Sequence, residues 1–560
     1  MLDDPAATFV PERPVNPDPV SATSLLVMSS WLASCTSGRK GHETCPRWEH
    51  QTSALPRRVV DVTSGIPKLH TPNAGQVGRY AALSYCWGGP QLHCTTNARF
   101  AQYHSALPMN DLPATIQDAI SITRALLIPF LWVDSLCIIQ DSAMDKTLEM
   151  AKMSSVYRNS YVTFCASRAG TCRDGFLGIQ EPTRDRTNCS ATIPIRCPDG
   201  RIGSVMLQPA TRLTTRRTRV DAPIHRRAWT YQEFLISPRV ISFYHDALEF
   251  KCARGLDSDD GLNTEELRMD MGASQPHLSP LFYRQKSELL SRFAWRGALS
   301  SRKRQSLRQL WNRILSEYSG RRLSDLDDKL PAFSAIASEF HRLWGGQYLA
   351  GLWDTQLVHD MQWYAADRCH DRDRYKLPVQ AVPSWSWASI RDAPIICHNT
   401  SEFSKQSPRV RVLKCWVDLV SKQAPFGLVK GGQLTITGPL KSMTILETWG
   451  CFGFDHNHHR TNRIGDFRSD FRWEPELPEP IPTLESILGI PNREPLFFLG
   501  LSMRPRDHAE TSGLVLLEIG DGRYERIAVF SIDDHSKTFR DRYATSHWGD
   551  DYEVKTISIC

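Results

Sequence analysis

The stretch Pro129-Phe-Leu-Trp-Val-Asp-Ser-Leu-Cys-Ile-Ile-Gln-Asp141 decides how the first half of this chain folds. Its apolar run, Phe130 to Val133, is short and is bounded by a proline and an aspartate. That pattern is typical of a strand buried on both faces, as in a parallel sheet. Asp134 follows this strand directly, at the position where open α/β sheets bind their ligands.

Two helical patterns and two further strands surround this stretch. Residues 80–87 and 161–166 read as strands, and residues 113–127 and 142–158 have the periodicity of amphipathic helices. Strand, helix, strand, helix and strand with short connections predict a parallel sheet with right-handed crossovers. The apolar face of the first helix is expected to consist of Ile116, Ala119, Ile120, Thr123 and Leu127. That of the second is expected to consist of Leu148, Ala151, Met153, Val156 and Tyr157.

The composition is typical of a large globular protein whose cysteines are reduced thiols. The chain has 560 residues, 41% hydrophobic and 23% charged, so several domains are expected. A net charge of +6 is too small for this length to indicate nucleic-acid binding by itself. The sequence contains no apolar run long enough to span a bilayer, and Asp3 and Asp4 argue against a signal peptide. Its 15 cysteines are mostly isolated, which fits reduced thiols in a cytosolic or nuclear protein, and a cytoplasmic location is predicted.

The chain divides into four predicted parts. Residues 1–75 form an N-terminal segment that contains cysteines and histidines, and residues 76–255 form the α/β domain. Residues 256–380 read as mainly helical, and residues 381–560 as rich in β-strands.

The first candidate site block is Leu83-Ser-Tyr-Cys-Trp-Gly-Gly89. Two glycines after a strand let backbone N–H groups approach a ligand, although a simple turn is the commoner meaning of such a pattern. Asp134 is either a ligand for a ribose hydroxyl or a cap for the following turn. Cys86 and Cys137 are expected to be buried structural thiols, because no local motif supplies a histidine base.

The second block is Arg227-Ala-Trp-Thr-Tyr-Gln-Glu233. An aromatic wall with a carboxylate one turn later can stack a flat ring and stabilise positive charge at an anomeric carbon. The alternative is an Arg–Glu surface pair with Trp229 in the core. A basic cluster precedes the block and is a phosphate site, a nucleic-acid patch or a solvated loop; it comprises Arg212, Arg216, Arg217, Arg219, Arg226 and Arg227.

The N-terminal segment holds the metal-ligand residue types Cys35, His42 and Cys45. Their spacing fits no standard zinc finger, so buried thiols and a surface histidine are the expected reading, with zinc as the alternative.

Together these blocks resemble the fungal heterokaryon incompatibility (HET) domain. The resemblance rests on Ala82-Leu-Ser-Tyr-Cys-Trp-Gly88, Leu112-Pro-Ala-Thr-Ile-Gln-Asp-Ala119, Leu131-Trp-Val-Asp-Ser-Leu-Cys-Ile-Ile-Gln-Asp141 and Arg227-Ala-Trp-Thr-Tyr-Gln-Glu233. It implies an effector of nonself recognition that triggers cell death after incompatible fusion, together with an unknown protein partner and self-association.

The domain is also distantly similar to TIR domains, which implies a flavodoxin-like parallel sheet and NAD as a substrate rather than a resident cofactor. Glu233 would then be the catalytic carboxylate. The substrate-binding residues would be Ser84, Tyr85, Trp87, Gly88, Asp134, Arg227 and Trp229. Two alternatives stay open, a non-catalytic module that signals by assembly and a nucleic-acid binder that uses the arginine cluster.

Overall fold

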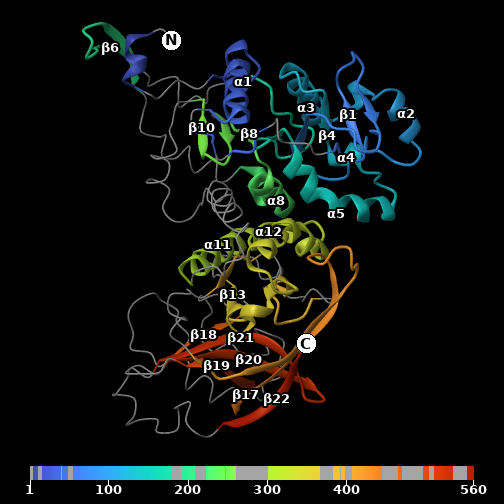
Figure 1. The fold of residues 1–560 in the computed structure, drawn as a ribbon, viewed down its shortest axis with the longest axis vertical. Coiled ribbons are helices and arrows are strands. Elements are labelled where there is room, and N and C mark those ends of the chain that lie inside the picture. Colours follow the sequence, from blue (N-terminus) through green and yellow to red (C-terminus); the bar gives the residue numbers. More distant parts are fainter. Residues whose placement is uncertain are drawn as a thin grey trace, which may run out of the picture. The chain divides into compact units, whose positions relative to one another are not determined.

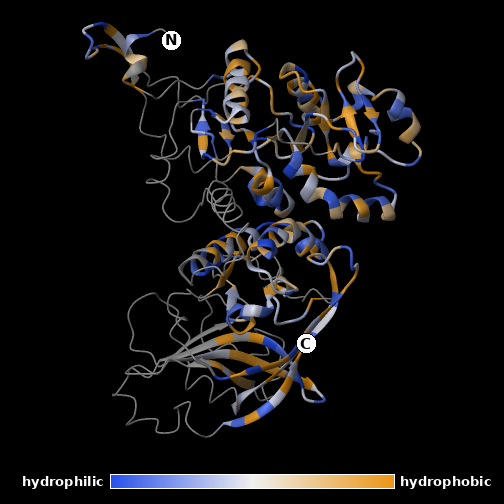
Figure 2. Ribbon diagram, in the orientation of Figure 1, coloured by the Kyte–Doolittle hydropathy of each residue, from blue (hydrophilic) through white to orange (hydrophobic). Residues whose placement is uncertain are grey.

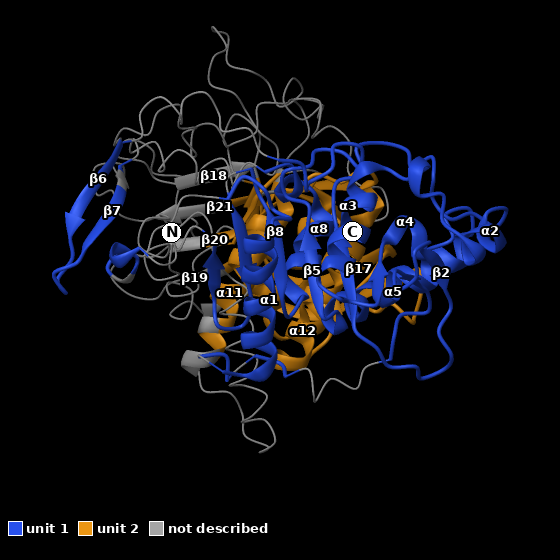
Figure 3. Cartoon of the chain, turned by 90° about the horizontal axis from the view of Figure 1, so that it is seen from above, with its two compact units in different colours: residues 1–296 blue, residues 297–560 orange. Residues whose placement is uncertain are grey.

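The computed structural model places two compact units, residues 1–296 and residues 297–560 (Figure 3). It describes residues 4–10, 16–39, 41–43, 45–47, 54–179, 191–207, 222–245, 247–259, 301–365, 382–390, 393–397, 407–443, 465–469, 496–503, 510–533 and 552–560. The strands of both units carry much of the hydrophobic colour in Figure 2, as expected for sheets that form the cores.

Four parallel strands form the centre of the first unit (Figure 1). They are β3 (Tyr80–Ser84), β4 (Phe130–Trp132), β5 (Val162–Cys165) and β8 (Val240–Phe243), and they lie in the order β4-β3-β5-β8. The pairings β3–β4, β3–β5 and β5–β8 are all parallel. This is the order of the first four strands of a flavodoxin-like sheet. The predicted fold class is therefore confirmed.

Antiparallel strands extend this parallel centre at both edges. β1 (Val59–Asp61) pairs with β4 on one side and with β2 (Lys68–His70) on the other. At the opposite edge β8 pairs with β9 (Leu248–Lys251), which pairs with β10 (Leu256–Ser258). The sheet thus has eight strands, in the order β10-β9-β8-β5-β3-β4-β1-β2.

Helices cover both faces of this sheet (Figure 1). α1 and α3 lie on one side, and α5 and α8 lie on the other. The helices of this unit are α1 (Ala22–Ser37), α2 (Phe100–Ser105), α3 (Ala114–Ala125), α4 (Asp134–Cys137), α5 (Ala143–Asn159) and α8 (Ala228–Ile236). A separate hairpin pairs β6 (Ala191–Arg196) with β7 (Ile202–Leu207).

α3 buries the expected face except at its end. Ile116, Ala119, Ile120 and Thr123 are buried, but Leu127 is 81% exposed. The helix ends at Ala125, and Leu127 has a left-handed backbone (φ 55°) that turns its side chain away from the face it would have continued.

α5 differs more from its predicted apolar face, because the residues buried in its first turns are acidic. Ser142 caps the helix by accepting the N–H of Asp145 at 3.2 Å. Asp145 and Glu149 are buried, whereas Leu148 is 41% exposed. The reason is Arg58, which precedes β1, is 3% exposed and forms an ion pair with both carboxylates. A buried cation thus sets which side of the helix faces the sheet.

The second unit combines an aromatic helical layer with a barrel. Trp311 lies on α11 (Ser301–Ser319), and its ring contacts Phe340 and Trp344 of α12 (Ser334–Trp344) as well as Phe333 and Trp353. Five strands pair in a closed circuit: β17 (Val429–Met443), β19 (Leu496–Met503), β20 (Glu510–Gly520), β21 (Arg523–Asp533) and β22 (Glu553–Ile559). β16 (Arg411–Leu419) pairs with β17 outside this circuit. Residues 297–380 of the predicted helical region thus share one compact unit with the predicted β-rich region, whereas residues 256–296 belong to the first unit.

The remaining bounds in this unit complete the description. The helix is α13 (Leu357–Asp360), and the short strands are β11 (Tyr348–Leu349), β12 (Leu352–Trp353), β13 (Trp363–Ala365), β14 (Ile395–Cys397) and β15 (Ser407–Pro408). A further strand is β18 (Gly465–Ser469).

Candidate functional site at the carboxyl edge of the parallel strands

The candidate site lies where β3 ends. The connection after β3 leads to β4 on one side, and the connection after β4 returns past β3 to β5 on the other. Such a change of direction is a topological switch point, where the loops separate and leave room for ligands beyond the carboxyl ends. Ser84 is the last residue of β3 and is in register with Cys165, the last residue of β5.

Ser84 and Glu233 meet beneath this edge. The Ser84 hydroxyl donates to Glu233 Oε2 at 2.5 Å, although 149 positions separate the two residues. Both side chains are buried, with Glu233 on the inward side of α8. Burial raises the pKa of Glu233 to about 7, and Asp134 adds to this rise, while Ser84 and Arg227 oppose it. A carboxyl group with this pKa exchanges its proton near neutral pH.

Trp87 and Asp134 form a second pair nearer the surface. The Trp87 indole Nε1–H donates to Asp134 Oδ2 at 2.9 Å, and the backbone N–H of Ser135 donates to Oδ1 at 2.6 Å. Asp134 therefore accepts hydrogen bonds from Trp87 and from the residue that follows it, whereas the N-cap position of α4 is Val133. Burial raises the pKa of Asp134, and the charge of Arg227 opposes that rise.

Arg227 connects the two pairs. It is half-buried immediately before α8, and its guanidinium donates to the carbonyl oxygen of Tyr85 at 2.5 Å. The Tyr85 hydroxyl donates to Ser135 Oγ at 2.9 Å, which links the end of β3 to the α4 turn. Trp229 is half-buried on the first turn of α8. These contacts form one cluster, in which Glu233 is buried and Trp87, Asp134 and Arg227 are half-buried; its members are Ser84, Tyr85, Trp87, Asp134, Arg227 and Glu233.

Gly88 allows the chain to turn sharply beside this cluster. Its φ is +70°, and a Cβ atom there would lie 2.4 Å from Thr171 Cβ and 2.8 Å from Thr171 Cα. Gly88→Ala is expected to destabilise the protein by about 2 to 4 kcal/mol, because backbone strain and overlap with a backbone atom add. Urea denaturation followed by tryptophan fluorescence measures the loss. The matched control is Gly65→Ala, where a Cβ meets nothing within 4 Å; equal losses for the two variants would contradict the steric argument.

The two cysteines near the site are held as neutral thiols. Burial raises the pKa of Cys86 to about 11 and that of Cys137 to about 12. A thiol nucleophile acts as the thiolate, so these values agree with the predicted structural role.

Only part of the arginine cluster falls within the described residues. Arg226 is exposed at the end of the 3₁₀ helix Pro223–Arg226, and Arg227 turns inward to Tyr85. Arg212, Arg216, Arg217 and Arg219 lie outside the described residues.

The three metal-ligand candidates of the N-terminal segment come together at a different place. Cys35, His42 and Cys45 are all buried, and a fourth residue, Cys252, joins them. His42 is therefore not the surface histidine that the sequence favoured.

Sequence reasoning missed two contributors to the candidate site. Tyr157, predicted only as part of the apolar face of α5, donates its hydroxyl to the carbonyl oxygen of Leu83 at 3.0 Å and interacts with Glu233. Ser135 receives the Tyr85 hydroxyl. The available signal was the hydroxyl of a tyrosine on a helix face that was expected to be buried, because such a hydroxyl needs a hydrogen-bond partner there.

The chemical capacity of the cluster follows from its charges. One carboxyl group that exchanges a proton near pH 7 lies in a buried environment with a hydroxyl, a second carboxylate and a guanidinium. A low-dielectric environment strengthens the interaction of such a carboxylate with positive charge on a ligand. The indole ring of Trp87 supplies a flat apolar surface beside Asp134.

Comparison with known proteins identifies the domain that carries this site. No curated protein and no solved structure matches the chain significantly. The family model described as Heterokaryon incompatibility protein (HET) matches residues 80–233. The match begins at the first residue of β3 and ends at Glu233, so it spans all of the predicted catalytic and substrate-binding residues but not the metal-ligand candidates. Residues 80–233 of this chain are therefore a HET domain.

Proposed function

We propose that this protein is an effector of fungal heterokaryon incompatibility that causes cell death by cleaving NAD in its HET domain. The observation that carries the proposal is the buried Glu233, hydrogen-bonded to Ser84 under the carboxyl edge of β3. The HET match supports the incompatibility role. The reaction is supported by the buried carboxyl group beside Ser84, whose pKa is raised to about 7. The proposed place of action is the cytoplasm, where NAD is abundant.

The proposed reaction breaks the bond between the nicotinamide nitrogen and the ribose C1′ atom. The electron pair of that bond leaves with nicotinamide, and positive charge develops on the ribose ring. The Glu233 carboxylate stabilises this charge until water adds at C1′ and loses a proton. Nicotinamide carries positive charge while bound, which favours ionisation of a carboxyl group whose pKa is about 7.

The neighbouring residues receive supporting roles under this proposal. Trp87 and Trp229 offer aromatic surfaces to the nicotinamide ring. Arg227 and Asp134 provide charges for phosphate oxygens and ribose hydroxyls, respectively. Gly88, with its left-handed backbone, lets the loop after β3 pass close to the ligand.

Glu233→Gln is expected to abolish both NAD loss and killing in yeast that express the full-length chain. Glutamine keeps the shape and the contact with Ser84 but cannot stabilise a developing cation by charge. NAD content and viability are measured together, at matched protein abundance. Glu249→Gln is the control, because Glu249 is also a buried glutamate but lies on β9 outside the cluster.

Two other outcomes would replace the proposal with its alternatives. If wild type and Glu233→Gln both kill while NAD stays constant, the domain signals by assembly and Glu233 is structural. If wild type depletes NAD and Glu233→Gln does so equally, the reaction does not depend on this carboxylate. For the nucleic-acid alternative, binding to duplex DNA or RNA would weaken steeply with salt.

A further inference from the structure

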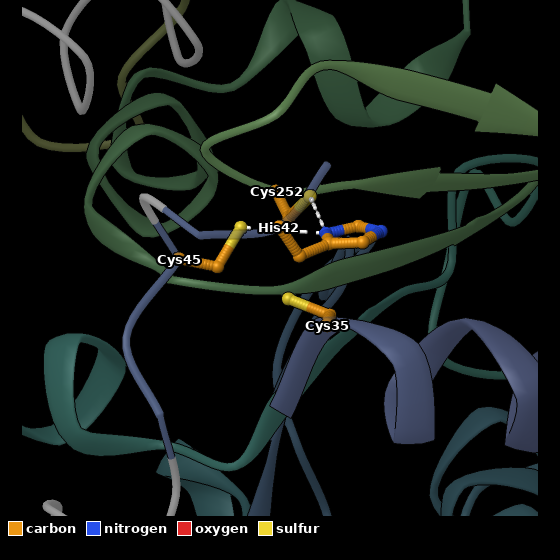
Figure 4. Close-up of side chains that lie close together, drawn as sticks. All are labelled: Cys35, His42, Cys45 and Cys252. Carbon is orange, nitrogen blue, oxygen red and sulfur yellow. Dashed lines mark hydrogen bonds between the residues drawn. The ribbon is translucent and has the colours of Figure 1, made fainter. Parts of the chain in front are cut away.

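A second chemically distinctive cluster lies in the first unit, away from the end of β3. It consists of Cys35, His42, Cys45 and Cys252, here named the Cys/His cluster (Figure 4). Their exposed fractions are 0%, 2%, 4% and 1%, respectively. Each residue offers one ligand atom, and the four ligand atoms all lie within 4.8 Å of one another. Figure 4 shows the three sulfur atoms and the imidazole ring pointing toward a common centre.

The distances inside the cluster match the edges of a tetrahedral metal site. His42 Nδ1 lies 3.4 Å from Cys45 Sγ and 3.4 Å from Cys252 Sγ. Zinc binds thiolate at about 2.3 Å and imidazole nitrogen at about 2.0 Å, so these two ligands stand about 3.5 Å apart in a tetrahedron. One imidazole nitrogen is thus equally close to two sulfur atoms, as it would be if all three bound one ion.

We propose that the Cys/His cluster binds one Zn²⁺ ion through three cysteine thiolates and His42 Nδ1. Three sulfur atoms and one nitrogen form a ligand set typical of structural zinc sites, and soft thiolates select zinc over magnesium or calcium. The protein supplies all four ligands, so the site is closed and its role is structural rather than catalytic.

The local backbone brings three of the ligands together within a short segment. Cys35 lies in the last turn of α1, which ends at Gly38 with a left-handed φ of 67°. The chain then reverses so that the backbone N–H of His42 donates to the carbonyl oxygen of Arg39 at 3.2 Å, and that of Cys45 to the carbonyl oxygen of His42 at 2.9 Å. His42 and Cys45 therefore sit on one tight turn, as paired ligands do in many zinc sites.

The fourth ligand comes from the other end of the domain. Cys252 follows β9, and its N–H donates to the carbonyl oxygen of Gly255 at 3.0 Å in the turn between β9 and β10. Nearby, the ring of Trp31 on α1 stacks on Phe250 of β9 with centroids 5.7 Å apart. A zinc ion here would join the N-terminal helix to the β9–β10 edge of the sheet, in addition to this stack.

Arg254 completes the surroundings of the cluster. Its Nη1 lies 3.3 Å from His42 Nε2 and 3.4 Å from Asp257 Oδ2. A guanidinium only donates hydrogen bonds, so Nε2 accepts here and the ring proton sits on Nδ1. Metal binding at Nδ1 moves that proton to Nε2, and Arg254 then has Asp257 as its acceptor. Three thiolates and Zn²⁺ carry a net charge of −1, which Arg254 also balances.

The first experiment measures the metal content of the full-length protein, purified without chelators from zinc-containing medium. About one zinc ion per chain is expected for wild type and for the control Cys172→Ala, whose thiol is buried outside the cluster. Cys252→Ala should lose most of this zinc. Zinc-free wild-type protein that takes up none when zinc chloride is added would overturn the proposal, as would full retention by Cys252→Ala.

A second measurement covers the case in which Cys252→Ala fails to fold. X-ray absorption at the zinc edge of wild-type protein should give a first shell of three sulfur atoms and one nitrogen. Treatment with a chelator should lower the melting temperature of wild type and of Cys172→Ala, and added zinc should restore both. A shell dominated by oxygen, or a disulfide between two cluster cysteines found by mass spectrometry, would overturn the proposal.

Discussion

Arg58→Met is expected to lower the free energy of unfolding of the first unit by about 3 to 5 kcal/mol. Arg58 is 3% exposed, forms ion pairs with Asp145 and Glu149, and donates from Nε to the carbonyl oxygen of Cys137 at 2.6 Å. Methionine fills a similar volume but leaves two buried carboxylates without that cation. The loss should be largest at neutral pH, where both carboxyl groups ionise in the unfolded chain, and should shrink in acid.

The chain offers a matched control in the preceding residue. Arg57 also reaches Asp145, at 3.0 Å, but its side chain is 48% exposed, so Arg57→Met should cost less than about 1 kcal/mol. Urea denaturation of both variants makes the comparison. The triple variant Arg58→Met, Asp145→Asn, Glu149→Gln should recover much of the loss, because the buried charges are then removed together. Equal losses for the two arginine variants would contradict the argument from burial.

The Cys137 contact extends the effect of Arg58 to the candidate site. Cys137 is the last residue of α4, and Asp134 is the first. Arg58 therefore fixes the last residue of α4, and the first residue of the same short helix, Asp134, accepts the hydrogen bond from Trp87.

Glu233→Gln is expected to make the protein more stable than wild type at pH 8, and not at pH 4.5. Burial raises the pKa of Glu233 from 4.5 to about 7 in the folded state. The folded protein therefore keeps this proton between these values while the unfolded chain loses it, and wild-type stability falls as the pH rises through that window. The full difference amounts to about 3 kcal/mol as an upper bound.

Thermal melts of wild type and variant from pH 4.5 to 8.5 check this expectation. The difference in melting temperature should grow up to about pH 7 and then stay constant. Glu518→Gln is the control, because Glu518 is exposed on β20 and its loss should leave the wild-type profile unchanged. Parallel profiles for wild type and Glu233→Gln would mean that the carboxyl group is not destabilised by burial. A buried glutamate that lowers the stability of the fold near neutral pH, as Glu233 is expected to do, points to a functional role for that residue.

Local sequence patterns predicted the parallel centre of the sheet and the helices beside it. The apolar run at 130–133 and the alternation of strands and helices depend on neighbouring residues, which a sequence displays directly. The grouping of Ser84, Asp134 and Glu233 was expected only from the resemblance to TIR domains, because Glu233 lies within α8 and no local pattern relates it to the end of β3. Their pairing as Ser84–Glu233 and Trp87–Asp134 depends on how α8 and α4 pack, which no local pattern contains.

What the sequence did not predict depends on partners that are far away along the chain. The acidic inward face of α5 makes sense only once Arg58, 87 positions earlier than Asp145, lies against it. The Cys/His cluster likewise lacked its fourth member, because Cys252 is 210 positions from His42 and stands alone in its segment. Reading Cys35, His42 and Cys45 by spacing alone could not supply it.

The order of the eight strands bears on where this protein can be cut. The family match begins at Tyr80 and ends at Glu233, yet β4 pairs with β1 before it and β5 pairs with β8 after it. A fragment trimmed to the match would leave the backbone N–H and C=O groups along both outer strands without partners, the condition that favours edge-to-edge aggregation. The boundaries of the family match therefore delimit the shared sequence and not a domain that can fold by itself. A fragment that keeps the sheet intact begins before Arg58 and continues beyond β10.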